Sequence, residues 1–222
     1  MTCTSATRAV TIMAAKYSAG VATTRTHSRY VTAATSVLRW HRRFCVDLPR
    51  GVRARRPRRV PGPDAAGAVL SWIGSERIAI SGVPSPQGVA HLAEQGVTHV
   101  VNCRPRAPVW WFGDLTAERA AFGPGRVAHA PMQDHGRRQR PAVWAAAACF
   151  AARVLDDEPH AGILIHCSAG RRRSAMLAYA VLRLRGHDPT WAAALVLRYR
   201  PQAQLVPAYV HSVERWLAVA AQ

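Results

Sequence analysis

The stretch of sequence that decides the fold is ILIHCSAGRRRS, residues 163–174. Its first four residues, three of them apolar, are typical of a buried strand. A helix is predicted from Ser174 to Arg185, where Gly186 ends it. The small-residue loop between strand and helix turns successive backbone N–H groups toward one concave site. The stretch therefore predicts an anion-binding nest at a helix N-terminus.

Cys167 lies at the start of this loop and Arg173 at its end. Backbone amides, the helix dipole and a nearby guanidinium group all stabilise a thiolate at such a position. The planar fork of Arg173 suits bidentate contact with phosphate oxygens. The pattern predicts a nucleophile and a phosphate cradle within one loop. The alternative is a buried, inert thiol beside a basic helix start.

The spacing Cys-x5-Arg is not specific by itself, because about one residue in eight of this chain is arginine. The specificity comes from the whole pattern around the cysteine. His166 precedes it, Gly170 follows three positions later and Ser174 seven positions later, all between a predicted strand and a predicted helix. This combination favours the reactive thiol over the inert one.

Short apolar runs and longer helical patterns alternate on both sides of the loop. The predicted strands are Arg77–Ser81, Val97–Cys103, Val127–Pro131 and Ile163–His166. The further predicted helices are Pro86–Gln95, Pro141–Asp156, Thr190–Tyr199 and Val206–Val219, and Asp114 is expected to start another. This alternation predicts one α/β domain over residues 66–222, with a central, mainly parallel sheet flanked by helices.

The 222-residue chain carries a net charge of +18, and most of it lies in the first sixty residues, which hold 13 basic side chains and one acid, Asp47. Residues 1–65 form a basic extension rich in Arg, Ser and Thr, separated from the domain by Pro61-Gly62-Pro63. We expect this extension to be disordered, with weak, nonspecific binding to polyanions. A transit peptide, or an upstream start codon that is not used (Met13 being one alternative), are the other interpretations.

The five cysteines are odd in number, irregular in spacing and without a C-x-x-C pair. They argue against a disulfide framework or a structural zinc site and favour a reducing compartment, so we expect a cytoplasmic protein. Cys103 and Cys149 lie within apolar runs and are predicted to be core thiols. No stretch approaches the ~20 apolar residues of a membrane span. His91, His99 and His129 lack ligand spacing, and we expect neither metal nor cofactor.

The segment from His166 to Ser174 resembles the H-C-x-x-G-x-x-R-S/T signature loop of the cysteine-based protein phosphatases. The following AMLAY (175–179) resembles the dual-specificity branch in particular, as does Arg200-Pro201 ahead of a terminal helix. Ile78–Arg104 resembles the entry strand, helix and second strand of the same family. The likeness covers about 75 to 218.

The resemblance implies roles for individual residues. Cys167 is expected to attack phosphorus and form a phosphocysteine that water hydrolyses, with Arg173 binding the equatorial oxygens. Ser174 is expected to hydrogen-bond the sulfur, and His166 to orient the loop. The phosphate is expected to lie against Ser168, Ala169, Gly170, Arg171, Arg172 and Arg173.

The family also uses a general acid, on a loop some thirty residues before the cysteine. Asp134, in PMQDHG (131–136), lies 33 positions before Cys167, between a predicted strand and a predicted helix. Asp114, Asp156 and Asp157 fit that place less well. The resemblance therefore implies that Asp134 protonates the leaving oxygen.

The expected substrate is a phosphorylated protein or another phosphomonoester. Phosphotyrosine, with phosphoserine and phosphothreonine if the pocket is shallow, is the first expectation. The loop cations Arg171 and Arg172, with Arg137, Arg138 and Arg140 after the acid loop, leave open a phosphoinositide or RNA 5′-phosphate substrate. A non-catalytic phosphate- or nucleic-acid-binding module is the third alternative.

Overall fold

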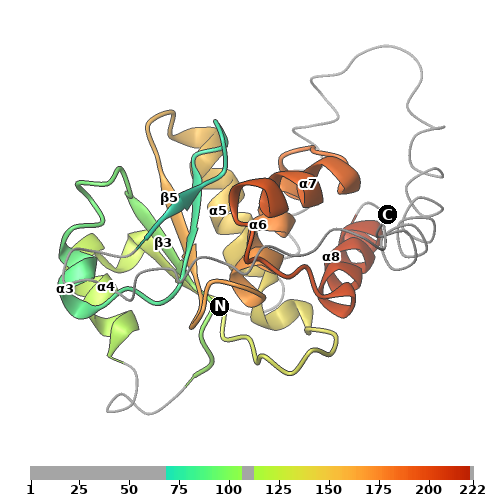
Figure 1. Cartoon of the computed structure of the whole chain (residues 1–222), viewed down its shortest axis with the longest axis horizontal. Coiled ribbons are helices and arrows are strands. Elements are labelled where there is room, and N and C mark those ends of the chain that lie inside the picture. Colours follow the sequence, from blue (N-terminus) through green and yellow to red (C-terminus); the bar gives the residue numbers. More distant parts are fainter. Residues whose placement is uncertain (1–68, 107–112, 221–222) are drawn as a thin grey trace, which may run out of the picture.

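The computed structural model describes residues 69–106 and 113–220 (Figure 1). The basic extension expected over 1–65 lies outside the described residues. Among the described helices, none combines the length and the apolar character that a membrane crossing needs.

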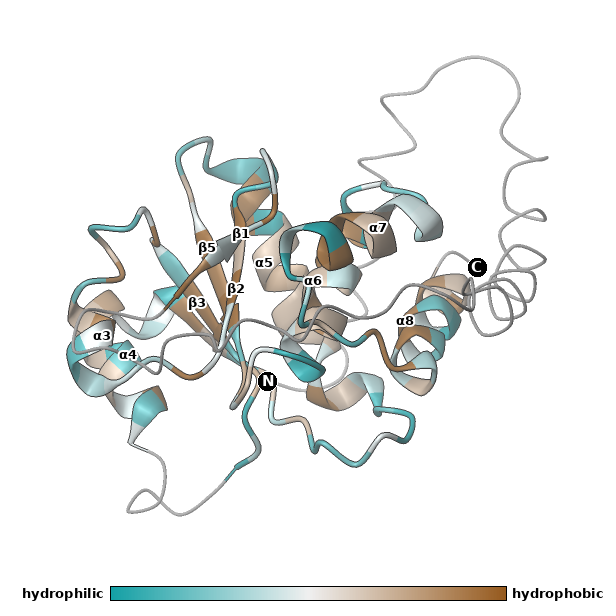
Figure 2. Ribbon diagram, viewed as in Figure 1, coloured by the Kyte–Doolittle hydropathy of each residue, from teal (hydrophilic) through white to brown (hydrophobic). Residues whose placement is uncertain are grey.

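The centre of the fold is a five-stranded sheet with the order β1-β2-β5-β3-β4. Strands β2 (Ile78–Ser81), β5 (Ile163–His166), β3 (His99–Asn102) and β4 (Val127–His129) run parallel, and β1 (Ser71–Trp72) pairs antiparallel with β2. Every residue of β2, β3 and β5 is buried, as expected for a parallel sheet covered on both faces. Figure 2 shows the hydrophobic residues of these strands in brown. The predicted mainly parallel α/β fold is confirmed, whereas β1 was not foreseen.

Alternate residues along the strands divide the core into two layers. Ala79, Val100 and Leu164 pack with residues of the α3–α4 region, helices α3 (Pro86–Ala90) and α4 (Asp114–Phe122). The opposite face is covered by α5 (Ala145–Asp157), α6 (Arg173–Leu184), α7 (Pro189–Tyr199) and α8 (Pro207–Ala220) (Figure 1). The buried α6 lies at the centre of this larger layer, and every residue from Arg173 to Leu182 is buried.

Two predicted helices differ from the observed ones. The α3 helix ends at Ala90, and the chain continues in turns to Gly96, whose φ is +86°. The stretch opened by Pro141 begins as a short 3-10 helix, η2 (Pro141–Val143), and becomes α-helical only at Ala145. Trp144 between them has φ −136°, outside helical values, and its buried indole packs edge-on against Trp216 at 5.1 Å. Core packing of one large side chain interrupts the helix there.

The parallel strands bring the loop after β5 to the same edge of the sheet as the segments after β2, β3 and β4. That loop passes so close to the segment after β2 that only glycine fits at Gly170. A Cβ there would lie 2.4 Å from the carbonyl carbon of Ser81, and the φ of Gly170 is +65°. The sheet edge therefore sets the path of the loop.

We expect Gly170→Ala to lower the free energy of unfolding by about 2 kcal/mol or more, since it adds a backbone clash to a left-handed conformation. Chemical denaturation measures the effect. Gly125→Ala is the matched control, because a Cβ at Gly125 meets nothing within 4 Å and its φ is not positive. Equal stability of the two variants would contradict the close approach.

Candidate active site

The loop from Cys167 to Arg173 directs its carbonyl oxygens away from its own centre. The Ser168 carbonyl accepts from the N–H of Val83 at 3.2 Å, and the Arg171 carbonyl accepts from the N–H of Gln204 at 2.8 Å. The Gly170 carbonyl accepts from Nε of the buried Arg200 at 3.2 Å. Because these acceptors are used outside the loop, its N–H groups are left for the concave side, where an anion fits.

The Cys167 thiol lies in this concavity and is 2% exposed. Its Sγ is 3.4 Å from Oγ of Ser174, and backbone N–H groups of Ser174 and Arg171 also hydrogen-bond to it. Burial is the largest influence on this thiol and raises its pKa, but the Ser174 hydrogen bonds and the charge of Arg173 outweigh it. The pKa of Cys167 is therefore lowered from its usual value, which favours the thiolate.

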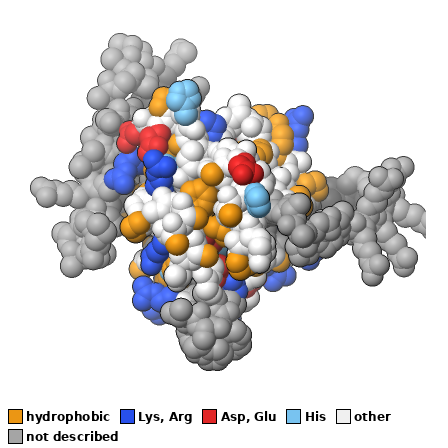
Figure 3. All heavy atoms as spheres, turned by 90° about the vertical axis from the view of Figure 1, so that its left-hand side faces the viewer, with side chains coloured by type: hydrophobic (Ala, Val, Ile, Leu, Met, Phe, Trp, Pro, Cys, Tyr) orange, Lys and Arg blue, Asp and Glu red, His pale blue; other side chains and the backbone are white. Residues whose placement is uncertain are grey.

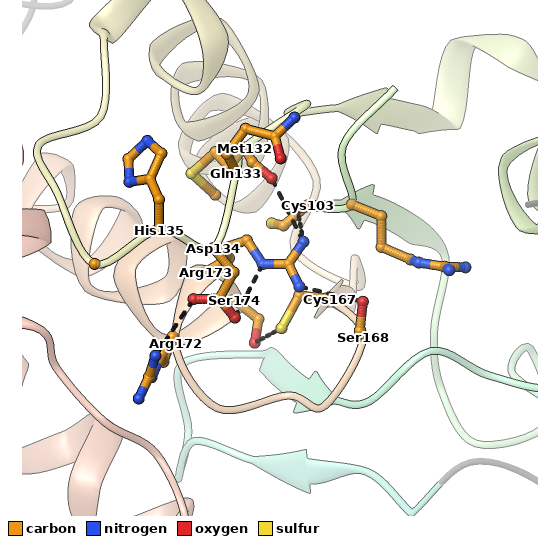
Figure 4. A network of polar contacts seen from close by, with 12 residues as sticks. Cys103, Met132, Gln133, Asp134, His135, Cys167, Ser168, Arg172, Arg173 and Ser174 are labelled. Atoms are coloured by element: carbon orange, nitrogen blue, oxygen red, sulfur yellow. Dashed lines mark hydrogen bonds and ion pairs between the residues drawn. The ribbon is translucent and has the colours of Figure 1, made fainter. Parts of the chain in front are cut away.

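Arg173 spans the mouth of the loop (Figure 4). Its guanidinium donates to Oγ of Ser168 at 3.1 Å and to the carbonyls of Met132 and Cys103 at 3.4 and 3.5 Å. The buried Nε has no hydrogen-bond acceptor among the described residues and lies 3.7 Å from Oδ2 of Asp134. A rigidly held cation with a remaining donor is suited to bind the oxygens of a phosphate.

Asp134 faces the cysteine loop from the segment after β4, between two arginines (Figure 4). Oδ1 of Asp134 is 3.8 Å from the guanidinium of Arg172, whose Nε donates to Oε1 of Gln204 at 2.8 Å. The Asp134 side chain is 38% exposed, so it can reach a ligand bound at the loop.

The segment that carries Asp134, residues 133–139, is hydrogen-bonded to helix α8. The buried Tyr209 hydroxyl accepts from the N–H of Gly136 at 3.1 Å and is 3.2 Å from the Gln133 carbonyl and 3.4 Å from Oδ1 of Asp134. The Ser212 hydroxyl accepts from the N–H of Gln139 at 3.0 Å. These contacts with α8 orient the Asp134 carboxylate.

A buried polar network lies beneath the loop. Nε2 of His166 is 2.7 Å from Oε1 of Glu118, outside hydrogen-bond alignment, and both side chains are fully buried. Nδ2 of Asn102 donates to Glu118 at 3.1 Å and to Asp114 at 2.8 Å, and Asp114 also pairs with Arg104 at 2.9 Å. Burial raises the pKa of Asp114, but Asn102 and Arg104 more than offset this, so its pKa is lowered.

Donor atoms of Asp114, Glu118 and His166 lie within 4.8 Å of one another, as metal ligands could. Both carboxylates already accept hydrogen bonds from Asn102, and Asp114 also pairs with Arg104. These side chains satisfy the carboxylate oxygens and supply a positive charge, as a metal ion would otherwise do. These contacts describe a support for His166 better than a metal centre. The expected absence of metal and cofactor stays a prediction.

The structure brings every predicted site residue to one edge of the sheet. Cys167, Ser174, Arg173 and Asp134 converge there, and His166 lies directly beneath. Sequence reasoning missed Glu118, Tyr209 and the supporting role of Arg200. Of these, only Arg200 carried a signal, through the Arg200-Pro201 pair; Glu118 and Tyr209 occupy ordinary helical positions.

Comparison with solved structures assigns the fold. The structure of kinase associated phosphatase (KAP) with its catalytic site cysteine changed to serine aligns with a TM-score of 0.59 and 16% identity, over 71% of this chain and 98% of that one. Human DUSP28 gives 0.54 and 20%, over 71% and 100%. PTPMT1 in complex with PI(5)P gives 0.56 and 14%, over 68% and 96%. No family model matches the sequence, and no curated protein matches it significantly. The chain has the fold of the dual-specificity cysteine phosphatases.

We expect alkylation by iodoacetamide to separate the cysteines by pH. Because its pKa is lowered, Cys167 should react at a pH below that needed by an ordinary cysteine. Burial raises the pKa of Cys149 to about 11, so this thiol should react only in strong alkali and is the internal control. Mass spectrometry of digested protein measures both.

Ser174→Ala should move the alkylation midpoint of Cys167 upward, since the hydrogen bonds from Ser174 help to lower its pKa. If Cys167 of the unsubstituted protein had an alkylation midpoint at or above that of free cysteine, the described geometry would be contradicted.

Proposed function

We propose that this protein is a phosphatase that hydrolyses phosphomonoesters on proteins through a phosphocysteine intermediate. The observation that carries the proposal is the buried Cys167, whose pKa is lowered by hydrogen bonds with Ser174 and the charge of Arg173, in a loop whose carbonyls point outward. Asp134 faces it from the opposite loop. The fold, shared with KAP and DUSP28, supports the proposal.

In the first step the Cys167 thiolate attacks phosphorus, forming the S–P bond as the bond to the leaving oxygen breaks. Asp134, entering the step protonated, gives its proton to that oxygen, which would otherwise leave as a poor alkoxide or phenoxide. Arg173 and the loop N–H groups hold the three equatorial oxygens and stabilise their charge in the transition state.

In the second step water attacks the phosphocysteine and Asp134 takes the proton of that water. The S–P bond breaks, and the sulfur leaves as a thiolate. The Ser174 hydroxyl, 3.4 Å from Sγ, donates to this thiolate and makes it a better leaving group. His166 and Glu118 act as positioning residues, because their buried contact fixes the residue directly before Cys167.

A phosphoinositide substrate is the second candidate, because the fold also resembles PTPMT1, which was crystallised with PI(5)P. The loop cations on which this alternative rests are used unequally. Both side chains are exposed, but Arg172 is engaged by Gln204 and Asp134, whereas no such contact to Arg171 is found among the described residues. The loop thus offers one additional cation rather than two, and we favour protein substrates.

Hydrolysis of para-nitrophenyl phosphate tests the proposal. Cys167→Ser should lower kcat by about 10⁴-fold or more, because no thiolate remains at this position. Asp134→Asn should lower kcat by about 10²-fold or more with weakly activated aryl or alkyl phosphates and less with good leaving groups. Undiminished turnover in Cys167→Ser would rule out the mechanism, and a loss independent of the leaving group would assign the proton to another residue.

Tyr209→Phe should lower kcat about tenfold with a poor leaving group and leave it nearly unchanged with a good one, since the hydroxyl orients Asp134. Tyr179→Phe is the matched control, because its buried hydroxyl donates to Glu214 instead. Equal effects of the two variants across leaving groups would mean that Tyr209 only stabilises the fold.

A further inference from the structure

A cavity of about 360 Å³ lies beside the cysteine loop and takes no part in the chemistry above. It opens where β3 and β4 end, and its polar lining is basic. The side chains that matter here are Asn102, Arg104, Arg106, Asp114, Arg119 and His129. We call this set the Arg106–Arg119 pocket. Its size is in the range of small-ligand sites.

The pocket adjoins the phosphate loop through the sheet. Asn102 at its wall is the register partner of His166, and the next residue, Cys103, donates its N–H to the His166 carbonyl at 2.8 Å. The Cys103 carbonyl also accepts from Arg173. Because neighbouring strands are ~4.8 Å apart, a group in the pocket lies roughly 5–10 Å from a group held by the loop.

Charge in the pocket is unbalanced. Arg104 pairs with Asp114, so these two cancel. Arg106 and Arg119 are exposed, come from different segments, and have no carboxylate within 4 Å among the described residues. Their charges converge on the half-buried His129, whose pKa is lowered first by burial and further by both arginines. Arginine side chains also follow the border of the face that bears α3 and α4 (Figure 3).

Other exposed arginines of the described residues lie on open surface, and the arginine-rich composition is enough to explain their presence. Arg106 and Arg119 differ because they line a concave site next to the loop that holds the reacting phosphate. An anion bound in this concave site interacts with both guanidinium charges at once, which a single arginine on an open face does not offer.

We propose that the Arg106–Arg119 pocket binds a second anionic group of the substrate, a phosphate or carboxylate on the peptide that carries the reacting phosphate. This inference rests on the proposed function and narrows its substrate class to acidic phosphopeptides. An extended peptide advances 3.3–3.6 Å per residue, so the second group lies two or three residues from the phosphorylated one.

Three peptides test the assignment: a phosphotyrosyl peptide with glutamine three residues away, the same peptide with glutamate there, and one with phosphoserine there. The double variant Arg106→Gln/Arg119→Gln should lower kcat/KM about tenfold for the two acidic peptides and leave the glutamine peptide and para-nitrophenyl phosphate unchanged. Arg126→Gln/Arg153→Gln removes the same charge outside the pocket and should show no such preference.

Equal losses for acidic and neutral peptides, or equal behaviour of the two double variants, would overturn the proposal. If the Arg106→Gln/Arg119→Gln variant lost kcat/KM only for a soluble inositol bisphosphate and not for any peptide, the pocket would be assigned to a lipid headgroup. That result would also overturn the proposal.

A binding readout separates this inference from the mechanism. In Cys167→Ser protein, the acidic peptides should raise the pKa of His129 followed by NMR, because an anion beside Arg106 and Arg119 offsets their charge. The glutamine peptide should raise it less. If the peptides shift the pKa of His129 but the unsubstituted protein does not hydrolyse them, only the phosphatase mechanism is refuted. If the protein hydrolyses them but the pKa of His129 does not shift, only the proposed role of the pocket is refuted.

Discussion

The disposition of carbonyl oxygens in the loop from Cys167 to Arg173 is the constraint on which the site depends. A loop can bind an anion with its N–H groups only if its carbonyls find donors elsewhere. Val83 supplies one of these donors from the segment after β2, and Arg200 and Gln204 supply the others from the connection between α7 and α8. The close contact of Gly170 with Ser81 locks the same loop against β2. The large buried layer around α6 keeps these segments in place, so stability and chemistry share the same contacts.

Arginine performs three different tasks around this loop, and burial separates them. Arg200 is buried behind the loop and fixes its backbone, while Arg173 is buried at its mouth and retains a donor for ligand oxygens. Arg172 lies at the surface and is directed toward Asp134. A net charge of +18 over the whole chain conveys none of this. Electrostatics in the site comes from a few guanidinium groups whose positions the fold determines.

Local pattern predicted much of the fold, because strands and helices follow hydrophobic period and end signals. β5 is observed at its predicted bounds, and α6 begins one residue before its predicted start. Prediction failed where tertiary contacts overrode local preference. Trp144 breaks a helical stretch to place its indole in the core, and the two-residue β1 exists only because β2 lies beside it. Neither leaves a periodic signal.

The sequence by itself predicted the candidate loop, since Cys167, Gly170, Arg173 and Ser174 lie within eight residues, between an apolar run typical of a strand and a helical pattern. The positions of the two carboxylates near this loop, Asp134 and Glu118, were decided by the tertiary structure. Asp134 became a candidate through its distance along the chain, but only the α8 contacts through Tyr209 show how it is held. Glu118 meets His166 from a helix 48 positions away in sequence. Contacts of that range arise from sheet order and helix packing, which no local pattern records.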